Sequence, residues 1–167
     1  MKILTTILII AAPVLHLSAQ KVGYLNTQEV LAMMPELKEA NSNLEVMKTM
    51  FSKKGQEMLQ SLQQKYGELQ QKQAAGEIAP VELEKQSAQL KVDEEALRQF
   101  ESESQQKMVA KSEELLKPIQ EKVDAAIRAV ATENGYSYII DNSQGTILYA
   151  DPSSNVIDLI KTKLGLK

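Results

Sequence analysis

Acidic residues in adjacent pairs are the part of this sequence that comes nearest to a catalytic arrangement. Glu94 and Glu95 form one pair, and Glu113 and Glu114 form another. Two carboxylates can divide general acid and general base work when both face the same substrate. Adjacent residues of a helix point in different directions, however, so a solvent-facing helix surface explains both pairs better. We therefore predict no catalysis by these carboxylates.

A second candidate for chemistry is the segment that begins at Asp141. Asp141, Ser143 and Gly145 are spaced like the start of a calcium-binding loop, but the later bidentate Glu and most other oxygen ligands are missing. The run from Asp141 to Gly145 is instead typical of a turn. We predict a hairpin turn here and no metal site.

The residue types that the chain lacks exclude most other active sites. It has no Cys and a single His, His16, which lies in a segment that we expect to be removed. Cys nucleophiles, Cys-ligated zinc, serine triads and His-ligated metals are therefore unavailable. A hydrolase that uses carboxylates alone is the enzyme class that remains, and no motif supports it. We predict that the protein is not an enzyme and has no cofactor.

The composition indicates the overall shape of the protein and excludes one class of binding partner. Aromatic residues make up 4% of the 167 residues although 43% are hydrophobic, which favours a helical or elongated shape over an aromatic-centred globule. The chain has 19 Lys and Arg against 22 Asp and Glu. Because a nucleic-acid-binding protein needs a basic surface, this acidic balance predicts no nucleic-acid partner.

Residues 1–19 have the three parts of a secretory signal peptide. Lys2 supplies the positive start, an apolar run follows from Ile3 to Leu17, and small residues end the segment at Ala19. The run is shorter than the roughly 20 residues that a membrane span needs. We predict removal of this segment, with Gln20 as the new N-terminus, rather than a retained anchor.

Two long stretches of the chain have apolar residues at helical spacing. The first predicts a helix from Pro35 to Lys72 with a weak layer at Lys54 and Gly55. Its apolar positions are Leu37, Ala40, Leu44, Met47, Phe51, Met58, Leu62, Tyr66 and Leu69.

The second stretch predicts a helix from Val81 to Glu133 that is bent at Pro118 and ends at Asn134-Gly135. Its seam positions are Leu83, Leu90, Leu97, Phe100, Ser104, Met108, Leu115, Ile119, Val123, Ile127 and Val130. Gly76 and Pro80 interrupt the pattern, so the chain reverses over residues 74–80 and the helices form an antiparallel hairpin.

Shorter elements flank this hairpin. We predict a strand from Val22 to Asn26, a short helix capped by Thr27, and a terminal helix after residue 154. Strands at residues 136–140 and 146–150 would form a β-hairpin. The predicted fold is therefore α+β, with a coiled-coil arm at 35–111 on a small β-strand body. The body is discontinuous and combines residues 20–34 with 112–167.

Three short strands cannot bury their own edges and faces. We therefore predict a homo-oligomer that shares its body and projects its arms. The candidate interface residues are Val22, Tyr24, Ile139, Ile140, Ile147 and Leu148.

Methionines are concentrated in the first half of the arm. Flexible, polarizable Met side chains either fill gaps between helices or form surfaces that accept varied apolar partners, and both interpretations stay open. The candidate contact residues are Met47, Met50, Phe51, Met58, Leu62 and Tyr66.

The two ends of the chain carry a distinctive set of motifs. They are the run Lys21 to Thr27, Met33-Met34-Pro35, the run Leu116 to Ile119, the run Glu133 to Tyr136, the run Tyr138 to Asp141, the run Tyr149 to Pro152 and the run Asn155 to Ile160. With these motifs the chain resembles the Skp/OmpH family of periplasmic chaperones. The resemblance implies a homotrimer shaped like a jellyfish, in which the body is completed by trimerisation. It further implies an ATP-independent holdase that keeps unfolded outer-membrane proteins from aggregating in a cavity between its helical arms.

One departure from the family concerns the arm tips. Known members have basic tips, whereas residues 60–90 here contain more Glu than Lys. This argues against membrane-surface contact at the tips through lipopolysaccharide or phospholipid, but not against hydrophobic holding. The alternative function is a structural periplasmic coiled-coil spacer or scaffold that binds no client.

Overall fold

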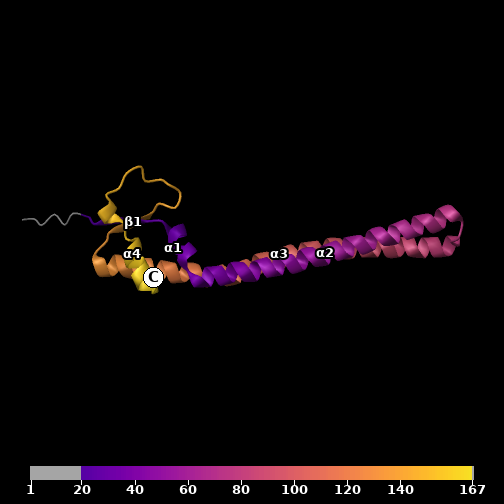
Figure 1. The fold of residues 1–167 in the computed structure, drawn as a ribbon, viewed down its shortest axis with the longest axis horizontal. Helices are drawn as coiled ribbons and strands as arrows, with labels where there is room; N and C mark the ends of the chain where they lie inside the picture. Colours follow the sequence, from indigo (N-terminus) through magenta and orange to yellow (C-terminus); the bar gives the residue numbers. More distant parts are fainter. Residues whose placement is uncertain (1–19, 167) are drawn as a thin grey trace, which may run out of the picture.

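The computed structural model describes residues 20–166, so the predicted signal peptide at 1–19 lies outside the described residues. A long two-helix arm projects from a small body (Figure 1). The elements in order are β1 (Val22–Leu25), α1 (Thr27–Met33), α2 (Pro35–Ala75), α3 (Pro80–Asn134), β2 (Tyr138–Asp141), the 3-10 helix η1 (Pro152–Ser154) and α4 (Ile157–Leu164). We call α2 and the facing part of α3 the arm, and the remaining elements with the end of α3 the body.

Proline and glycine set the limits of the two long helices, as predicted. Pro35 and Pro80 occupy the first turns of α2 and α3, where a missing backbone N–H costs nothing. Gly76 and Gly135 follow the last turns with φ of 70°, a left-handed conformation that glycine adopts without strain. The 41 residues of α2 span about 60 Å at 1.5 Å per residue. Helix α3 runs through Pro118 without interruption, and the bend there stays a prediction.

The cap of α1 differs from the prediction by one residue. The side chain of Asn26, not that of Thr27, accepts hydrogen bonds from the backbone N–H groups of Gln28 and Glu29, at 3.0 and 3.3 Å. Thr27 is already helical, and its hydroxyl donates to Asp141 at 2.7 Å. The prediction was wrong because either residue type can cap a helix, and backbone geometry decides between neighbours.

Across residues 20–166 the sheet has two strands rather than the predicted three. Strands β1 and β2 pair in parallel, with Val22 opposite Tyr138 and Leu25 opposite Asp141. Residues 146–150 form no strand, so the predicted β-hairpin was wrong. A turn does lie in the predicted segment, where the N–H of Gly145 donates to the carbonyl of Asn142 at 3.0 Å. The Asn142 side chain instead accepts the N–H of Ile147 at 2.9 Å and closes a loop. Strand propensity alone does not make a strand, because the segment must also pair with a neighbouring strand, and residues 146–150 pair with neither β1 nor β2.

The core of the body surrounds the last turns of α3. Five of its residues are almost completely buried and come from β1, α1 with the residue that follows it, and the C-terminal segment: Leu25, Val30, Met34, Val156 and Ile160. They pack with Ile119, Val123, Ala126 and Val130 of α3. The arm has a second, smaller core near its tip, where Leu62 and Leu69 of α2 meet Leu90 of α3. The molecule thus has two separate apolar cores, one in the body and one in the outer half of the arm.

Candidate functional site

The outer face of the two-stranded sheet is apolar and exposed. Side chains alternate between the faces of a strand, and the register puts Val22, Tyr24, Tyr138 and Ile140 on the same face. Val22, Tyr138 and Ile140 are 43%, 61% and 44% exposed. Three of the predicted interface residues therefore share one surface, which we call the outer sheet face. The sequence analysis missed Tyr138, although its two-residue spacing from Ile140 could have revealed it.

The other three predicted interface residues lie elsewhere. Ile139 is on the opposite face of β2 and packs against the body core. Ile147 is half-buried in the loop after β2, and the adjacent Leu148 is fully exposed. Tyr149, which the sequence analysis did not select, is exposed beside it. The body therefore presents two apolar surfaces, the outer sheet face and this loop.

A carboxylate joins the end of β2 to the start of α1. Asp141 accepts hydrogen bonds from the backbone N–H and hydroxyl of Thr27, at 3.2 and 2.7 Å, and from the same two groups of Ser143, at 2.9 and 3.0 Å. Partial burial raises the pKa of Asp141, but these hydrogen bonds outweigh it and hold the pKa below its usual value. The carboxylate that resembled a calcium ligand is thus fully engaged with protein donors.

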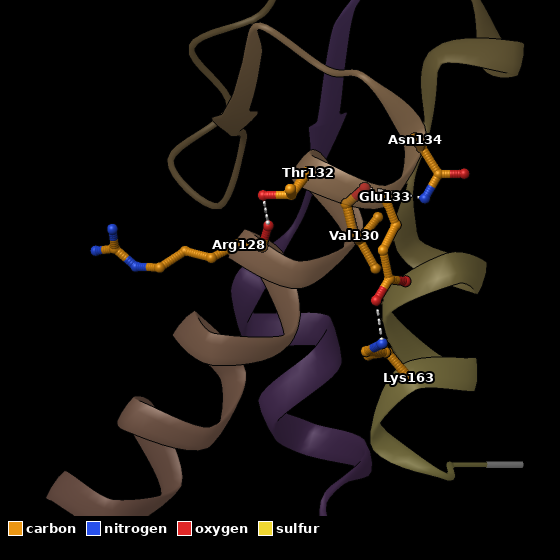
Figure 2. A network of polar contacts seen from close by, with 6 residues as sticks. All are labelled: Arg128, Val130, Thr132, Glu133, Asn134 and Lys163. Atoms are coloured by element: carbon orange, nitrogen blue, oxygen red, sulfur yellow. Dashed lines mark hydrogen bonds and ion pairs between the residues drawn. The ribbon is translucent and has the colours of Figure 1, made fainter.

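Polar contacts stabilise the end of α3, and one of them joins it to α4 (Figure 2). The Lys163 ammonium lies 2.5 Å from the Glu133 carboxylate, and this pair links the two helices. Asn134 donates from its side chain to the carbonyl of Val130 at 2.9 Å, and Thr132 donates to the carbonyl of Arg128 at 2.9 Å. The Arg128 side chain points away from the other labelled residues in Figure 2. Since the Lys163–Glu133 pair is exposed, it orients α4 more than it stabilises the fold.

The predicted contact residues of the arm fall into three environments. Met50 is 60% exposed, one turn from Val46 at 61%. Met47, Phe51 and Met58 are half-buried along the seam.

Leu62 and Tyr66 differ from these residues. Leu62 is buried in the core of the outer arm. The Tyr66 ring is largely exposed at the margin of the seam, and its hydroxyl donates to Glu94 at 2.7 Å. Because Glu94 accepts this hydrogen bond, the pKa of Tyr66 is raised. Glu95, the neighbour of Glu94, pairs instead with Arg98 at 3.1 Å, so the two carboxylates have different partners.

Ion pairs join the two helices of the arm at its root and in its outer half. At the root, the Lys122 ammonium bonds to Glu36 and lowers the pKa of that carboxyl. In the outer half, the Lys65 ammonium lies 2.5 Å from Asp93, and this hydrogen bond lowers the pKa of Asp93. These contacts fix the register of α2 against α3 at two points.

An aromatic pair marks the middle of the arm. The rings of Phe51 and Phe100 meet edge to face, with centroids 6.1 Å apart and planes at 82°. An open groove of about 390 Å³ lies beside them, with Gly55, Ser104 and Met108 in its lining. The Ser104 hydroxyl is buried and has no hydrogen-bond partner.

No group of three or more His, Cys, Asp or Glu in residues 20–166 is placed to hold a metal ion. Within the same residues, no helix combines the length and apolar character of a membrane span.

Both the sequence and the fold are similar to those of known proteins. The sequence profile of a family described as outer membrane protein (OmpH-like) matches residues 21–164. The fold is similar to the crystal structure of a candidate outer membrane chaperone (OmpH-like) from Caulobacter crescentus CB15. The TM-score is 0.74 at 17% sequence identity, over 88% of this chain and 85% of that chain. No curated protein matches the sequence.

Proposed function

The chain belongs to the OmpH-like family of outer membrane proteins, and from this premise we propose that it is a periplasmic chaperone that holds unfolded outer-membrane proteins without ATP. In this proposal the segment 1–19 directs export. Three copies share their bodies, and an unfolded client lies in the cavity between their arms. Many weak apolar contacts keep the client from aggregating.

Exposed apolar side chains on the arm are the observation that carries this proposal. In a protein that serves only as a structural spacer, the outer faces of the helices are polar. Here Val46 and Met50 form an exposed apolar pair on α2, and Val92 and Val109 are exposed on α3. Burial of such surface against an unfolded chain is favourable without any energy source. Met50 adds a flexible side chain that fits varied partners.

The outer sheet face supports the trimeric part of the proposal. A two-stranded sheet is too small to be stable by itself, and within the described residues Val22, Tyr138 and Ile140 of its outer face are exposed. Copies that meet through Val22, Tyr138 and Ile140 would bury this apolar surface. The exposed loop at Leu148 and Tyr149 offers a further contact surface.

The outer arm favours the alternative function, a structural spacer. Leu62, Leu69 and Leu90 close the seam there as in an ordinary coiled coil. A spacer, however, has no use for exposed Val46 and Met50. These two residues therefore distinguish the functions.

A holding assay tests the proposal. The protein without residues 1–19 should keep a urea-denatured outer-membrane β-barrel protein soluble at near-stoichiometric amounts, measured by light scattering. A Val46→Gln, Met50→Gln double variant should keep its helical content, because both side chains are exposed, and lose holding capacity.

The matched control is Leu159→Gln, which removes an exposed apolar side chain from α4 in the body. Client aggregation that is unchanged by the unmodified protein would refute the chaperone function. If the arm variant and the control keep the client soluble equally well, the Val46–Met50 surface is excluded as a client-binding site.

A further inference from the structure

We infer that the middle of the arm opens locally and that the Phe51–Phe100 layer, once opened, binds aromatic side chains of the unfolded client. The middle segment comprises residues 44–58 of α2 and 100–112 of α3. This inference rests on the proposed function and adds where and how a client is bound.

On both sides of the middle segment, contacts hold α2 and α3 together. At the root, Ala40 and Ile119 belong to the body core, and Lys122 bonds to Glu36. In the outer half, the Leu62–Leu69–Leu90 core, the Lys65–Asp93 pair and the Tyr66–Glu94 hydrogen bond join the helices. Both flanks therefore combine buried apolar side chains with polar contacts between helices.

The middle segment has neither buried apolar side chains nor ion pairs between the two helices. None of its apolar residues is buried, and Leu44, Met47, Phe51, Met58, Phe100 and Met108 are all half-exposed. The ion pairs in this part of the described chain stay within one helix, as Lys48–Glu45 and Lys107–Glu103 do. Fifteen residues of α2, about 22 Å of helix, thus run beside α3 with the half-exposed Phe51–Phe100 pair as a contact but with no buried apolar residue and no ion pair between the helices. Regions with few buried contacts have the lowest free energies of local opening.

Two residues weaken this segment further. Gly55 lies inside α2, where glycine is less favourable than alanine because its backbone loses more freedom on folding. Ser104 is the buried residue of the segment, and its unpaired hydroxyl carries an uncompensated desolvation cost. Opening rehydrates that hydroxyl. The two helices therefore part at this layer, with α2 unwinding locally around Gly55.

The side chains that become exposed on opening indicate which part of an unfolded client binds there. The chain has two Phe residues and no Trp, and both Phe residues meet in this one layer. Aromatic rings prefer edge-to-face or offset partners at 4.5–7 Å, so each released ring can pair with a ring of the client. Transmembrane β-barrel proteins carry girdles of aromatic residues at both membrane interfaces. An unfolded strand from such a girdle fits the opened layer.

Hydrogen exchange of the protein without residues 1–19 tests the opening. Amides in residues 44–58 should exchange faster than those in 62–72, although residues 62–72 are nearer the free tip. An arm that simply frays from its tip would give the opposite order and would overturn the proposal.

Matched glycine variants link opening to binding. A Cβ at position 55 would lie 3.8 Å from the Phe100 ring, an ordinary contact, and one at position 67 would meet nothing within 4 Å. Both changes to Ala favour helix equally, by about fivefold in an equilibrium constant. Gly55→Ala should slow exchange in the middle segment about fivefold. It should also weaken binding of a urea-denatured outer-membrane β-barrel protein about fivefold, because affinity scales with the open fraction. Gly67→Ala should change neither.

A second pair of variants acts from the other helix. Ser104→Ala removes the unpaired hydroxyl and should slow exchange and weaken binding in the same way, while Ser102→Ala, on the exposed side of α3, should do less. A β-barrel probe whose girdle aromatics are changed to Leu should bind about two- to tenfold more weakly than its parent, the range expected for lost aromatic pairs.

The outcomes separate this inference from the proposed function. If the unmodified protein binds no client, the chaperone function fails and the inference fails with it. If it binds, but Gly55→Ala slows exchange without weakening binding, or both probes bind equally, then the inference alone is overturned.

Discussion

Gly23 is the tightest point of the body. A Cβ at this position would lie 2.7 Å from Cγ1 of Val156 and 3.0 Å from Cε1 of Tyr136, both closer than ordinary contacts. We expect Gly23→Ala to lower the free energy of unfolding by about 1–3 kcal/mol, since overpacking forces neighbouring groups apart. Urea titration at a fixed protein concentration measures this change. Gly67→Ala, where space is open, should instead raise stability by about 0.5–1 kcal/mol, and equal effects of the two variants would contradict the packing argument.

Asp141 makes the body sensitive to acid. Its pKa is lower in the folded chain than in the unfolded chain, so its stabilisation is complete above the unfolded pKa and is lost as pH falls through the folded pKa. Asp141→Asn should reduce the melting temperature at pH 7 and have a smaller effect near pH 3. Thermal unfolding at both pH values measures the difference. A decrease that is equal at the two values would show that charge has no part in the contacts with Thr27 and Ser143.

At the residue scale, the sequence located the apolar side chains of the strands but did not show on which face of the sheet each one lies. Val22, Tyr24 and Ile140 were expected at an interface and do lie together on the outer sheet face. Ile139 was expected with them but belongs to the core. A shift of one residue turns a side chain to the other face of a strand, and the partner strand that sets the facing lies far away in the sequence.

At the scale of elements, the outer arm depends on a core of only three buried residues. Leu90 is the most buried of them, and it packs against Leu62 and Leu69. Leu90→Ala should destabilise this half of the arm by about 2 kcal/mol, at the low end for buried leucine because the site is close to solvent. Circular dichroism should show lost helix, and limited proteolysis should cut near the tip while the body stays intact.

The control for this variant is Val92→Ala, on the exposed surface of the same helix. It should leave both measurements almost unchanged. Loss of the body together with the tip in Leu90→Ala would contradict the separation into two cores.

The limits of the long helices could be predicted from sequence because local residues set them. Pro35, Pro80, Gly76 and Gly135 act through their own backbone angles, which require no distant partner. The third strand was predicted wrongly for the converse reason. Residues 146–150 have strand-forming side chains, but strand formation also requires pairing with another strand, and within the described residues they pair with neither β1 nor β2. Tyr66 was placed in the seam by its spacing, yet its ring lies at the margin.

At the scale of the whole molecule, the proposed trimer depends on the outer sheet face. Ile140→Lys would place a charge on this apolar surface, where an unpaired charge is costly to bury. Sedimentation velocity should show that the variant is shifted from trimer to monomer. Val81→Lys, at the exposed arm tip, should sediment like the unmodified protein. An unchanged trimer in Ile140→Lys would move the interface away from β1 and β2.

The parallel pairing of β1 with β2 has a consequence for the order of folding. Val22 and Tyr138 are neighbours in the sheet although the whole arm separates them along the chain. Closing so long a loop directly has a high entropic cost, whereas the contacts near the reversal at Gly76 join residues close in sequence. Helix pairing that spreads from the reversal towards Pro35 brings the two strands together step by step. We therefore expect the body to be the last part of the molecule to assemble, even though it includes the first strand of the chain.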